Sequence, residues 1–256
     1  MNKGSNGLSQ RVATCFSAAA DQYHSYDVLQ QQTAKRLLAQ MSPCKHLLDI
    51  GAGPGTSFTH LNGLEQVTSL DIAPGMLRIL ATNFPEYLAV CGDAQNLPFA
   101  SASVNGIYSN VALQWCDDLE LAISEANRVL TAGGEINLSI VAQDSLYQLR
   151  DLGFKINQFI APSRLLACFD TDLWHIEVCE TQAVNVYFSD LKAMLQSIKG
   201  VGAAIVKPAK ATNLPQVTLR GRKDWQALQA KAELSRAPEG LPLTYNISFI
   251  KARKKR

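Results

Sequence analysis

The feature that most constrains the fold is a short apolar run that ends in an acidic residue and is followed by glycines at alternate positions. Residues 47–56 read LLDIGAGPGT, so Asp49 precedes Gly51, Gly53 and Gly55. This order predicts a buried strand, a tight turn and a helix that packs back on the sheet. Because glycine has no side chain, such a turn lets a ligand approach the backbone closely.

The glycine spacing differs from that of the dinucleotide-binding fingerprint. That fingerprint is G-x-G-x-x-G with its acidic residue on the second strand, whereas this chain has G-x-G-x-G with Asp49 two residues ahead. A carboxylate at this point repels a diphosphate but attracts a ligand that carries ammonium and sulfonium groups. The pattern resembles the first motif of class I S-adenosylmethionine-dependent methyltransferases. An ordinary strand-to-helix turn remains the alternative, because glycine marks turns generally.

Two more expected strands end in acidic residues. Residues 67–71 and 87–91 read as strands, with Asp71 at the end of the first and Asp93 just after the second. Ligands in doubly wound sheets bind beyond the carboxyl ends of the strands, where an acidic side chain can hold a ribose diol. We therefore expect Asp71 to bind a ribose and Asp93 to accept from an adenine amino group. Three such residues after a glycine turn favour a ligand site over simple helix caps.

Strands alternate with helices through residue 142, which predicts parallel βαβ units. The fold class expected is therefore α/β, with a doubly wound, mostly parallel, seven-stranded sheet (Rossmann-like) and a helical cap. Further strands are expected at residues 104–109, 135–141, 174–188 and 243–252. Helices are expected to begin at residue 72, to run from residue 119 to the glycine pair at 133–134, and to lie at 144–169, 190–199 and 222–236.

Four segments are expected along the chain: an N-terminal helical cap segment (1–41), an S-adenosylmethionine-binding α/β core (42–188), a helical substrate-covering insertion (189–240) and a last core strand with a basic tail (241–256). The cap segment is predicted to be one helix from Ser9 to Met41. Tyr23 and Tyr26 would share one face of it. That face either covers the sheet as an ordinary amphipathic surface or forms an aromatic lid over a cofactor.

Composition excludes several classes of protein. The chain has 256 residues, 47% of them hydrophobic, which is enough for a full core. A net charge of +2 gives no reason to expect a nucleic-acid partner. The sequence has no apolar run of membrane-spanning length and no signal peptide, so we expect a soluble, cytoplasmic protein without a membrane partner. The six cysteines lack paired spacing and the four histidines are scattered, so no metal site is expected.

From about residue 11 to residue 253 the chain resembles the malonyl-acyl-carrier-protein O-methyltransferase family of biotin synthesis. Residues 48–55, 70–77 and 92–98 carry motifs that many methyltransferases share, while residues 16–26 with Gln30, 109–116, 195–203, 219–225 and 241–245 carry the more specific likeness. The chain departs from the family pattern at Ala52, Gln95, Ala204 and the segment before Gly133. Of these, Gln95 alone is expected near a cofactor contact.

The resemblance implies methyl transfer from S-adenosylmethionine, with S-adenosylhomocysteine as product, to the free carboxylate of malonyl-acyl-carrier protein. The product would be the malonyl methyl ester that primes pimeloyl formation. The partner implied is acyl carrier protein, and a small-molecule thioester is an alternative substrate. The cofactor-binding residues implied are Tyr23, Tyr26, Asp49, Gly51, Gly53, Gly55, Asp71, Ile72, Met76, Asp93, Ala94 and Asn110.

The reaction requires little acid–base chemistry. A malonyl carboxylate is ionised at neutral pH, so no general base is needed and no certain catalytic residue is predicted. We predict instead that the protein aligns nucleophile, methyl group and sulfur. Lys199 or Arg222 is predicted to orient the carboxylate; the alternative for each is a solvated surface charge.

The basic tail raises a separate question about partners. Lys251, Arg253, Lys254, Lys255 and Arg256 can attract an acidic carrier protein. The alternative is a disordered, solubilising end, as is common for termini.

Three other functions stay open from the sequence. The first is a class I methyltransferase that acts on another small carboxylic acid or on a quinone-like acceptor. The second is an RNA methyltransferase, which the low net charge disfavours. The third is a non-catalytic binding protein of the same fold.

Overall fold

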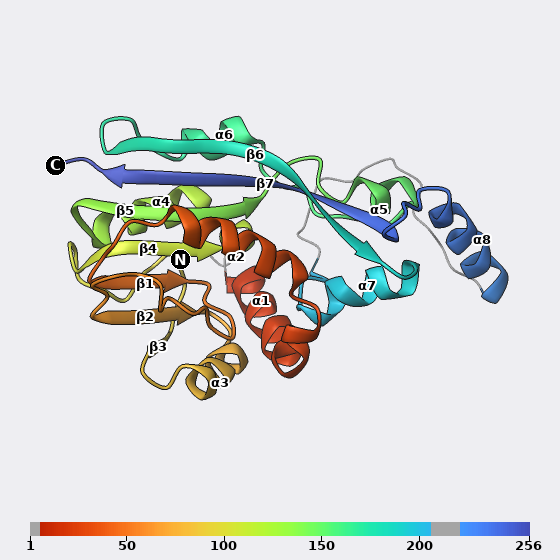
Figure 1. The fold of residues 1–256 in the computed structure, drawn as a ribbon, viewed down its shortest axis with the longest axis horizontal. Helices are drawn as coiled ribbons and strands as arrows, with labels where there is room; N and C mark the ends of the chain where they lie inside the picture. The colour runs from red at the N-terminus through yellow and green to blue at the C-terminus, as the bar shows by residue number, and fades with distance from the viewer. Residues whose placement is uncertain (1–5, 206–220) are drawn as a thin grey trace.

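The computed structural model describes residues 6–205 and 221–256. Within these residues, seven strands form one sheet in the order β3-β2-β1-β4-β5-β7-β6 (Figure 1). The strands are β1 (His46–Ile50), β2 (Gln66–Asp71), β3 (Leu88–Cys91), β4 (Val104–Asn110), β5 (Leu130–Val141), β6 (Trp174–Phe188) and β7 (Leu241–Lys254). Strands β1 to β5 pair in parallel, and β7 is antiparallel to both β5 and β6. The predicted fold class is confirmed.

Helices cover both faces of the sheet and gather at the carboxyl ends of the parallel strands (Figure 1). They are α1 (Asn6–Ala19), η1 (Ala20–Ser25), α2 (Val28–Gln40), α3 (Pro74–Asn83), η2 (Leu113–Trp115), α4 (Leu119–Val129), α5 (Tyr147–Asp151), α6 (Pro162–Ala167), α7 (Leu191–Gly200) and α8 (Arg222–Glu233). No helix in the described part of the chain is long and apolar enough to cross a membrane.

Strand β1 shows why this sheet needs cover on both faces. Side chains alternate across a strand, so Leu48 and Ile50 join a buried cluster with Ile123 of α4, while Leu47 joins another with Leu37 of α2. A strand that is apolar on both faces is stable only between two helical layers. The carboxyl ends of the parallel strands then remain the open edge where a ligand can reach the backbone.

The helix predicted after the glycine turn is absent, and this prediction was wrong. Residues 51–65 contain turns but no helix. Thr56, Ser57 and Thr59 have side chains that compete for backbone hydrogen bonds, and Gly63 has a φ of 75°. The segment instead buries the side chain of Phe58, which is fully inaccessible, against the sheet.

The predicted single helix from Ser9 to Met41 is also wrong, because the segment is three pieces. The chain turns at Tyr26 and Asp27 between η1 and α2. The buried Asp27 carboxylate accepts from Gln31 Nε2 at 2.6 Å and shares a hydrogen bond with His24 Nδ1 at 3.1 Å. Tyr23 and Tyr26 therefore do not share one face of an α-helix.

Residues 144–169 are mostly non-helical, contrary to the prediction. Helix α5 ends before Gly153, which has a φ of 92°, and α6 begins only at Pro162. A left-handed glycine ends a helix, and proline is compatible only with the first turn of the next one. The Pro208–Pro215 loop of the prediction lies outside the described residues.

Helix α4 ends at Val129, before the predicted glycine pair, and β5 begins at Leu130 rather than at Glu135. Leu130 is fully buried and pairs with Val104. The register then shifts before Gly106, where an irregularity accommodates Gly133 within the strand.

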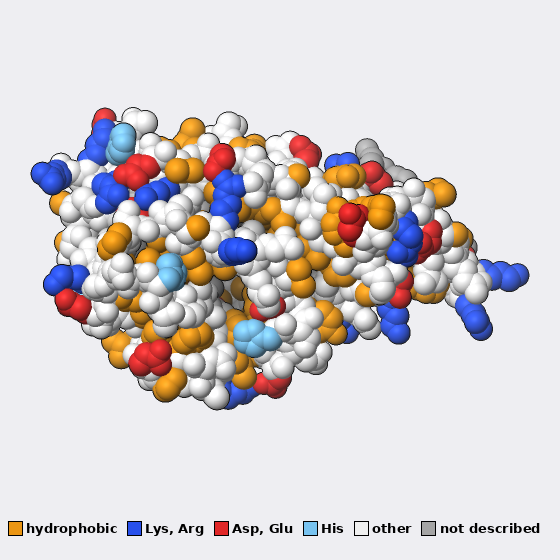
Figure 2. Space-filling model, in the orientation of Figure 1, with side chains coloured by type: hydrophobic (Ala, Val, Ile, Leu, Met, Phe, Trp, Pro, Cys, Tyr) orange, Lys and Arg blue, Asp and Glu red, His pale blue; other side chains and the backbone are white. Residues whose placement is uncertain are grey.

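The basic tail belongs to the last strand, so the alternative of a disordered end is wrong for residues 251–254. Arg253 Nη2 lies 2.8 Å and Lys251 Nζ 3.3 Å from the buried carboxylate of Glu135. Lys254 Nζ donates to the carbonyls of Asn127 and Leu130. The C-terminus lies at the opposite end of the molecule from α8 (Figure 1), and in Figure 2 blue and red side chains adjoin one another near it.

Candidate cofactor and substrate cavities

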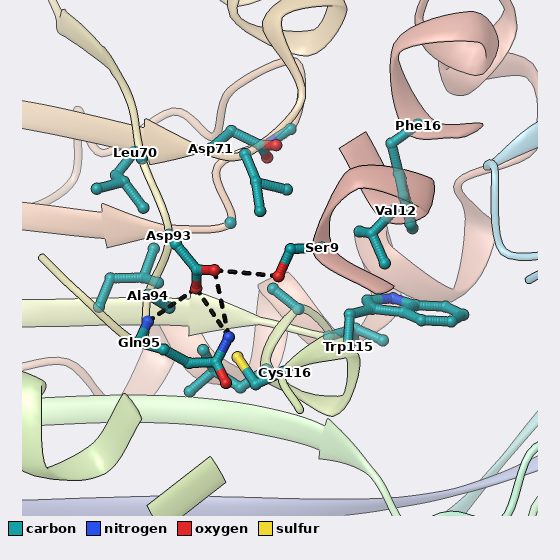
Figure 3. Close-up of a pocket in the computed structure, with 18 of the residues that line it drawn as sticks. Ser9, Val12, Phe16, Leu70, Asp71, Asp93, Ala94, Gln95, Trp115 and Cys116 are labelled. Carbon is teal, nitrogen blue, oxygen red and sulfur yellow. Dashed lines mark hydrogen bonds between the residues drawn. The ribbon is translucent and has the colours of Figure 1, made fainter. Parts of the chain in front are cut away.

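A first cavity lies at the carboxyl ends of β1, β2 and β4 and beneath helix α1 (Figure 3). Its floor comes from the glycine turn, from the residues after β2 and β3, and from the end of β4. The predicted residues that line it are Tyr23, Gly51, Gly53, Asp71, Ile72, Asp93, Ala94 and Asn110. Eight of the twelve cofactor-binding residues predicted from the sequence therefore meet in one cavity.

The three glycines of the turn are needed for different reasons. All have positive φ, 73° at Gly51, 55° at Gly53 and 98° at Gly55, which favours glycine. A Cβ at Gly51 would stand 2.2 Å from Ala112 Cβ, and one at Gly55 would stand 2.5 Å from Phe84 Cδ2. A Cβ at Gly53 would meet nothing within 4 Å, so Gly53 leaves space beside the cavity that it lines.

Asp71 fixes the shape of this turn. Its Oδ2 accepts from Gly53 N and its Oδ1 from Ala73 N, both at 2.8 Å. Burial raises the pKa of this carboxyl, and the backbone donors oppose that shift. Two carboxylate oxygens have about four lone-pair sites, so the carboxylate can still accept from a ligand hydroxyl.

Asp49 lies behind the turn and does not line the cavity. It is 1% exposed, and its Oδ2 is buried without a hydrogen-bonding partner among the described residues. Burial, followed by the negative charge of Asp71, raises its pKa well above the usual range. An unpaired buried carboxyl beside a second carboxyl is costly unless a cation balances the pair.

Asp93 connects the sheet to the N-terminal helix. Its Oδ2 accepts from Ser9 Oγ at 3.1 Å and its Oδ1 from Gln95 N at 2.9 Å (Figure 3). The Gln95 side chain also donates to Asp93 and accepts from Asp118 N. Ser9 was missed by sequence reasoning, since a serine inside a helix carries no distinguishing signal.

Asn110 and Val111 shape the turn after β4. Asn110 Nδ2 donates to Gln30 O at 2.9 Å, and its Oδ1 accepts from Ser139 Oγ at 2.7 Å. Val111 has a φ of 50°, which is strained for a β-branched residue. Its N–H donates to both the carbonyl and the hydroxyl oxygen of Ser139, which holds it in place.

A second cavity adjoins the first and was not predicted. Phe16, Tyr23, Val111 and Trp115 line both, and the rings of Phe16 and Trp115 meet edge to face at 5.6 Å. Its remaining walls come from the turn after η1, from α2, η2 and the end of β5, from residues 146–159, from α7 with the residues just after it, and from the strands β6 and β7. The sequence did carry a signal, because residues in the stretches 109–116, 195–203 and 241–245, which carried the specific resemblance, line it.

The remaining predicted residues lie elsewhere. Tyr26 lines the second cavity, and Met76 is buried in α3 against Ala20. Lys199 is exposed beside a separate surface hollow that Tyr26 also lines, and Arg222 is exposed at the start of α8. Asp49, Gly55, Met76, Lys199 and Arg222 line neither cavity. Among the described residues no group of three potential ligands could hold a metal ion.

Comparison with known proteins places this arrangement in a family. A family model described as methyltransferase domain matches residues 48–138. A solved chain from the complex between the Haloferax volcanii Trm112 methyltransferase activator and a methyltransferase matches with a TM-score of 0.61 at 18% identity, covering 96% of this chain and 98% of that one. At that identity the likeness shows the fold alone.

Two relatives are closer in sequence. The malonyl-acyl-carrier-protein O-methyltransferase of Herminiimonas arsenicoxydans is 33% identical over 263 residues, covering 96% of both chains. The biotin biosynthesis bifunctional protein BioHC of Cellvibrio japonicus is also 33% identical, over 94% of this chain, and this chain spans 49% of its length. The chain therefore belongs to the malonyl-acyl-carrier-protein O-methyltransferase family.

Proposed function

We propose that this protein transfers the methyl group of S-adenosylmethionine to the free carboxylate of malonyl-acyl-carrier protein, for biotin synthesis. The observation that carries the proposal is the pair of adjoining cavities, which share Phe16, Tyr23, Val111 and Trp115. A cofactor in one and an acyl group in the other would meet across this shared wall. The acceptor is inferred from the malonyl-acyl-carrier-protein O-methyltransferase of Herminiimonas arsenicoxydans, and the role in biotin synthesis from BioHC of Cellvibrio japonicus.

Three features of the first cavity support this cofactor. The Asp49 carboxyl, with an unpaired buried oxygen next to Asp71, suits a ligand with ammonium and sulfonium charges. Asp71 stands where a ribose diol is held in doubly wound sheets. Asp93 faces the cavity from the end of β3 and can accept from an adenine amino group. When bound, S-adenosylmethionine supplies the methyl group from a sulfonium centre and leaves as S-adenosylhomocysteine.

The chain's own contribution is alignment rather than proton transfer. The acceptor carboxylate is ionised at neutral pH and needs no base. Phe16 and Trp115, whose rings meet edge to face, form an apolar part of the wall that the two cavities share. Holding carboxylate, methyl carbon and sulfur in line can lower the barrier by roughly 7–11 kcal/mol in favourable cases.

We also propose a division of labour along the chain that follows the four segments. Residues 42–188 hold the cofactor with help from α1, which covers the first cavity through Ser9, Val12 and Phe16. Residues 189–240 cover the substrate, since α7 contributes Ser197 and Ile198 to the second cavity. Residues 241–256 complete the sheet.

The test is methyl transfer from labelled S-adenosylmethionine to malonyl-acyl-carrier protein, with acetyl-acyl-carrier protein as the matched control without a free carboxylate. We expect label in the malonyl species alone, as a base-labile ester. Asp71→Ala should abolish transfer by removing cofactor binding. Label in another small acid or in a quinone-like acceptor, with none in malonyl-acyl-carrier protein, would contradict the proposed acceptor while keeping the enzyme class.

A further inference from the structure

The second cavity has a lining without a single charged side chain among the described residues. Its polar groups are neutral, from tyrosine, tryptophan, glutamine, asparagine and serine side chains. A pocket for a carboxylate ordinarily offers a cation, whereas none of the Lys or Arg side chains in the described ranges 6–205 and 221–256 lines this one. If the proposed function holds, the described lining offers the acceptor carboxylate neutral hydrogen-bond donors.

Most of these donors already have partners. Ser197 Oγ donates to Met194 O, and Gln114 Nε2 donates to Val111 O. Asn157 Nδ2 donates to Ile205 O. Tyr23 forms a side-chain hydrogen bond with Gln30. These groups shape the wall but have limited capacity for a ligand.

Tyr245 differs from them. It lies on β7 opposite Val184 of β6, and its ring packs among apolar side chains beneath the second cavity. Within the described part of the chain its hydroxyl has no hydrogen-bonding partner. Burial raises the pKa of this phenol, so the group keeps its proton and remains a donor at every physiological pH.

Tyr26 is the other tyrosine of this lining without a side-chain partner among the described residues, and its position is different. It lines both the second cavity and the surface hollow that holds Lys199. Tyr26 is therefore at the entrance of the second cavity. Tyr245 lines the second cavity but not the surface hollow. Lys199 stands outside this entrance, where the carrier protein rather than the carboxylate would meet it.

We propose that the second cavity is the acyl subsite and that Tyr245 donates its hydroxyl hydrogen to the acceptor carboxylate, which makes Tyr245 a specificity-determining residue. This inference rests on the proposed function. A neutral donor forms a strong bond to an anion. A cation would hold the ionised ground state more tightly than the transition state, in which the carboxylate loses its charge as the ester forms, and would slow transfer.

The experiment measures binding of malonyl-pantetheine and acetyl-pantetheine to the protein saturated with S-adenosylhomocysteine, by calorimetry. The two ligands share the thioester and differ in the carboxylate. We expect Tyr245→Phe to weaken the binding of malonyl-pantetheine about 10- to 100-fold, as for loss of a hydrogen bond to a charged group. The affinity for acetyl-pantetheine should stay unchanged. Tyr187→Phe, at a 38%-exposed tyrosine of β6, is the matched control and should change the affinity for neither ligand.

Two results would overturn the inference. The first is an equal loss of affinity for both ligands, which would mean that Tyr245 contacts the shared thioester or maintains the shape of the cavity. The second is unchanged malonyl-pantetheine binding in Tyr245→Phe. Affinity for S-adenosylhomocysteine, measured on the same samples, should stay constant and verifies an intact fold.

Failure of the proposed function looks different in the same series. If the wild-type protein prefers malonyl-pantetheine through Tyr245 but transfers no methyl group to malonyl-acyl-carrier protein, the proposed function fails while the subsite stands. If methyl transfer occurs and Tyr245→Phe shows either overturning result, the function stands and the subsite assignment fails.

Discussion

The ring of Tyr26 lies on the backbone of Gly200, so closely that a Cβ atom at residue 200 would stand 2.1 Å from Tyr26 Cδ2. This contact joins the N-terminal segment to the end of α7. Tyr26 lines the second cavity and Gly200 lines the hollow outside it. The glycine is therefore required by close packing and not by an unusual φ.

Gly200→Ala should displace Tyr26 and cost about 1–3 kcal/mol of unfolding free energy, as other overpacked sites do. Because Tyr26 forms a wall of the second cavity, kcat/KM for malonyl-acyl-carrier protein should fall as well. Thermal melting and methyl-transfer kinetics measure the two effects. In a Tyr26→Ala background the same glycine substitution should be nearly neutral. Gly7→Ala, where a Cβ meets nothing within 4 Å, is the control.

Asp49→Asn should stabilise the cofactor-free protein. The folded-state pKa of Asp49 is raised above its unfolded value, so stability falls as the pH rises from the unfolded pKa through the folded one. Removing the ionisable group should add about 1–3 kcal/mol at neutral pH, the usual cost of an unsatisfied buried polar group. Denaturant unfolding without cofactor measures this gain. A destabilised Asp49→Asn protein would show that the carboxyl has a partner in solution.

Cofactor binding should release protons from Asp49. The positive charge of a ligand in the first cavity, near the buried pair of Asp49 and Asp71, should lower the raised pKa of Asp49. Affinity for S-adenosylmethionine should therefore increase with pH until Asp49 is ionised in the free protein. Calorimetry in two buffers of different ionisation enthalpy counts the protons. Asp49→Asn should bind more weakly and without this release. Equal release in the variant would assign the proton to another group.

Glu135 should stabilise the fold through the last strand. Burial raises the pKa of Glu135. Hydrogen bonds from Ser42 and Asn137 and the positive charge of Lys251 outweigh that effect and hold the pKa below its usual value. Its contribution is therefore present above the unfolded pKa and is lost as the pH falls through the folded one. Glu135→Ala should cost about 3–5 kcal/mol, as when one partner of a buried ion pair is removed.

Urea unfolding at several pH values tests the role of Glu135. The control is Glu65→Ala, since Glu65 forms an exposed pair with Lys45, for which a loss of about 0–1 kcal/mol is typical. Equal losses of unfolding free energy in the two variants would mean that the ion pairs of Glu135 with the basic residues of β7 do not stabilise the fold.

Lys199→Glu should impair the carrier-bound substrate selectively. Lys199 is exposed beside the hollow next to Tyr26, where it can attract an acidic partner. We expect kcat/KM for malonyl-acyl-carrier protein to fall about 10-fold at low salt and less at high salt, with malonyl-pantetheine unaffected. Lys35→Glu, at an exposed lysine of α2, serves as the control. An equal loss with malonyl-pantetheine would support the sequence prediction that Lys199 orients the carboxylate.

The parallel half of the fold was predictable because each strand has a local signature. Asp49, Asp71 and Asp93 follow apolar runs, and parallel pairing brings such strand ends to one edge. The sequence did not reveal that Asp49 is buried and is not part of the cavity lining. That depends on the pleat of β1, which is set by packing on both faces rather than by the spacing of residues.

Predictions failed where tertiary contacts override local pattern. The helical periodicity of residues 9–41 is real, but the buried Asp27 and its side-chain partners end one segment and start another. The second cavity was missed because its walls come from segments far apart in the sequence, such as Val111 and Tyr245. No local spacing encodes that meeting.

The position of β7 between β5 and β6 has a consequence for how the molecule is assembled. During synthesis β6 emerges from the ribosome well before β7, its only partner among the described strands. Until β7 is made, one edge of β5 is also unpaired. In the nascent chain the two strand edges that β7 later covers are therefore exposed, and such edges favour aggregation until they are paired. The closing strand is made last, so a chain truncated before residue 241 should need chaperones, or a peptide of residues 241–254 supplied in trans, to stay monomeric.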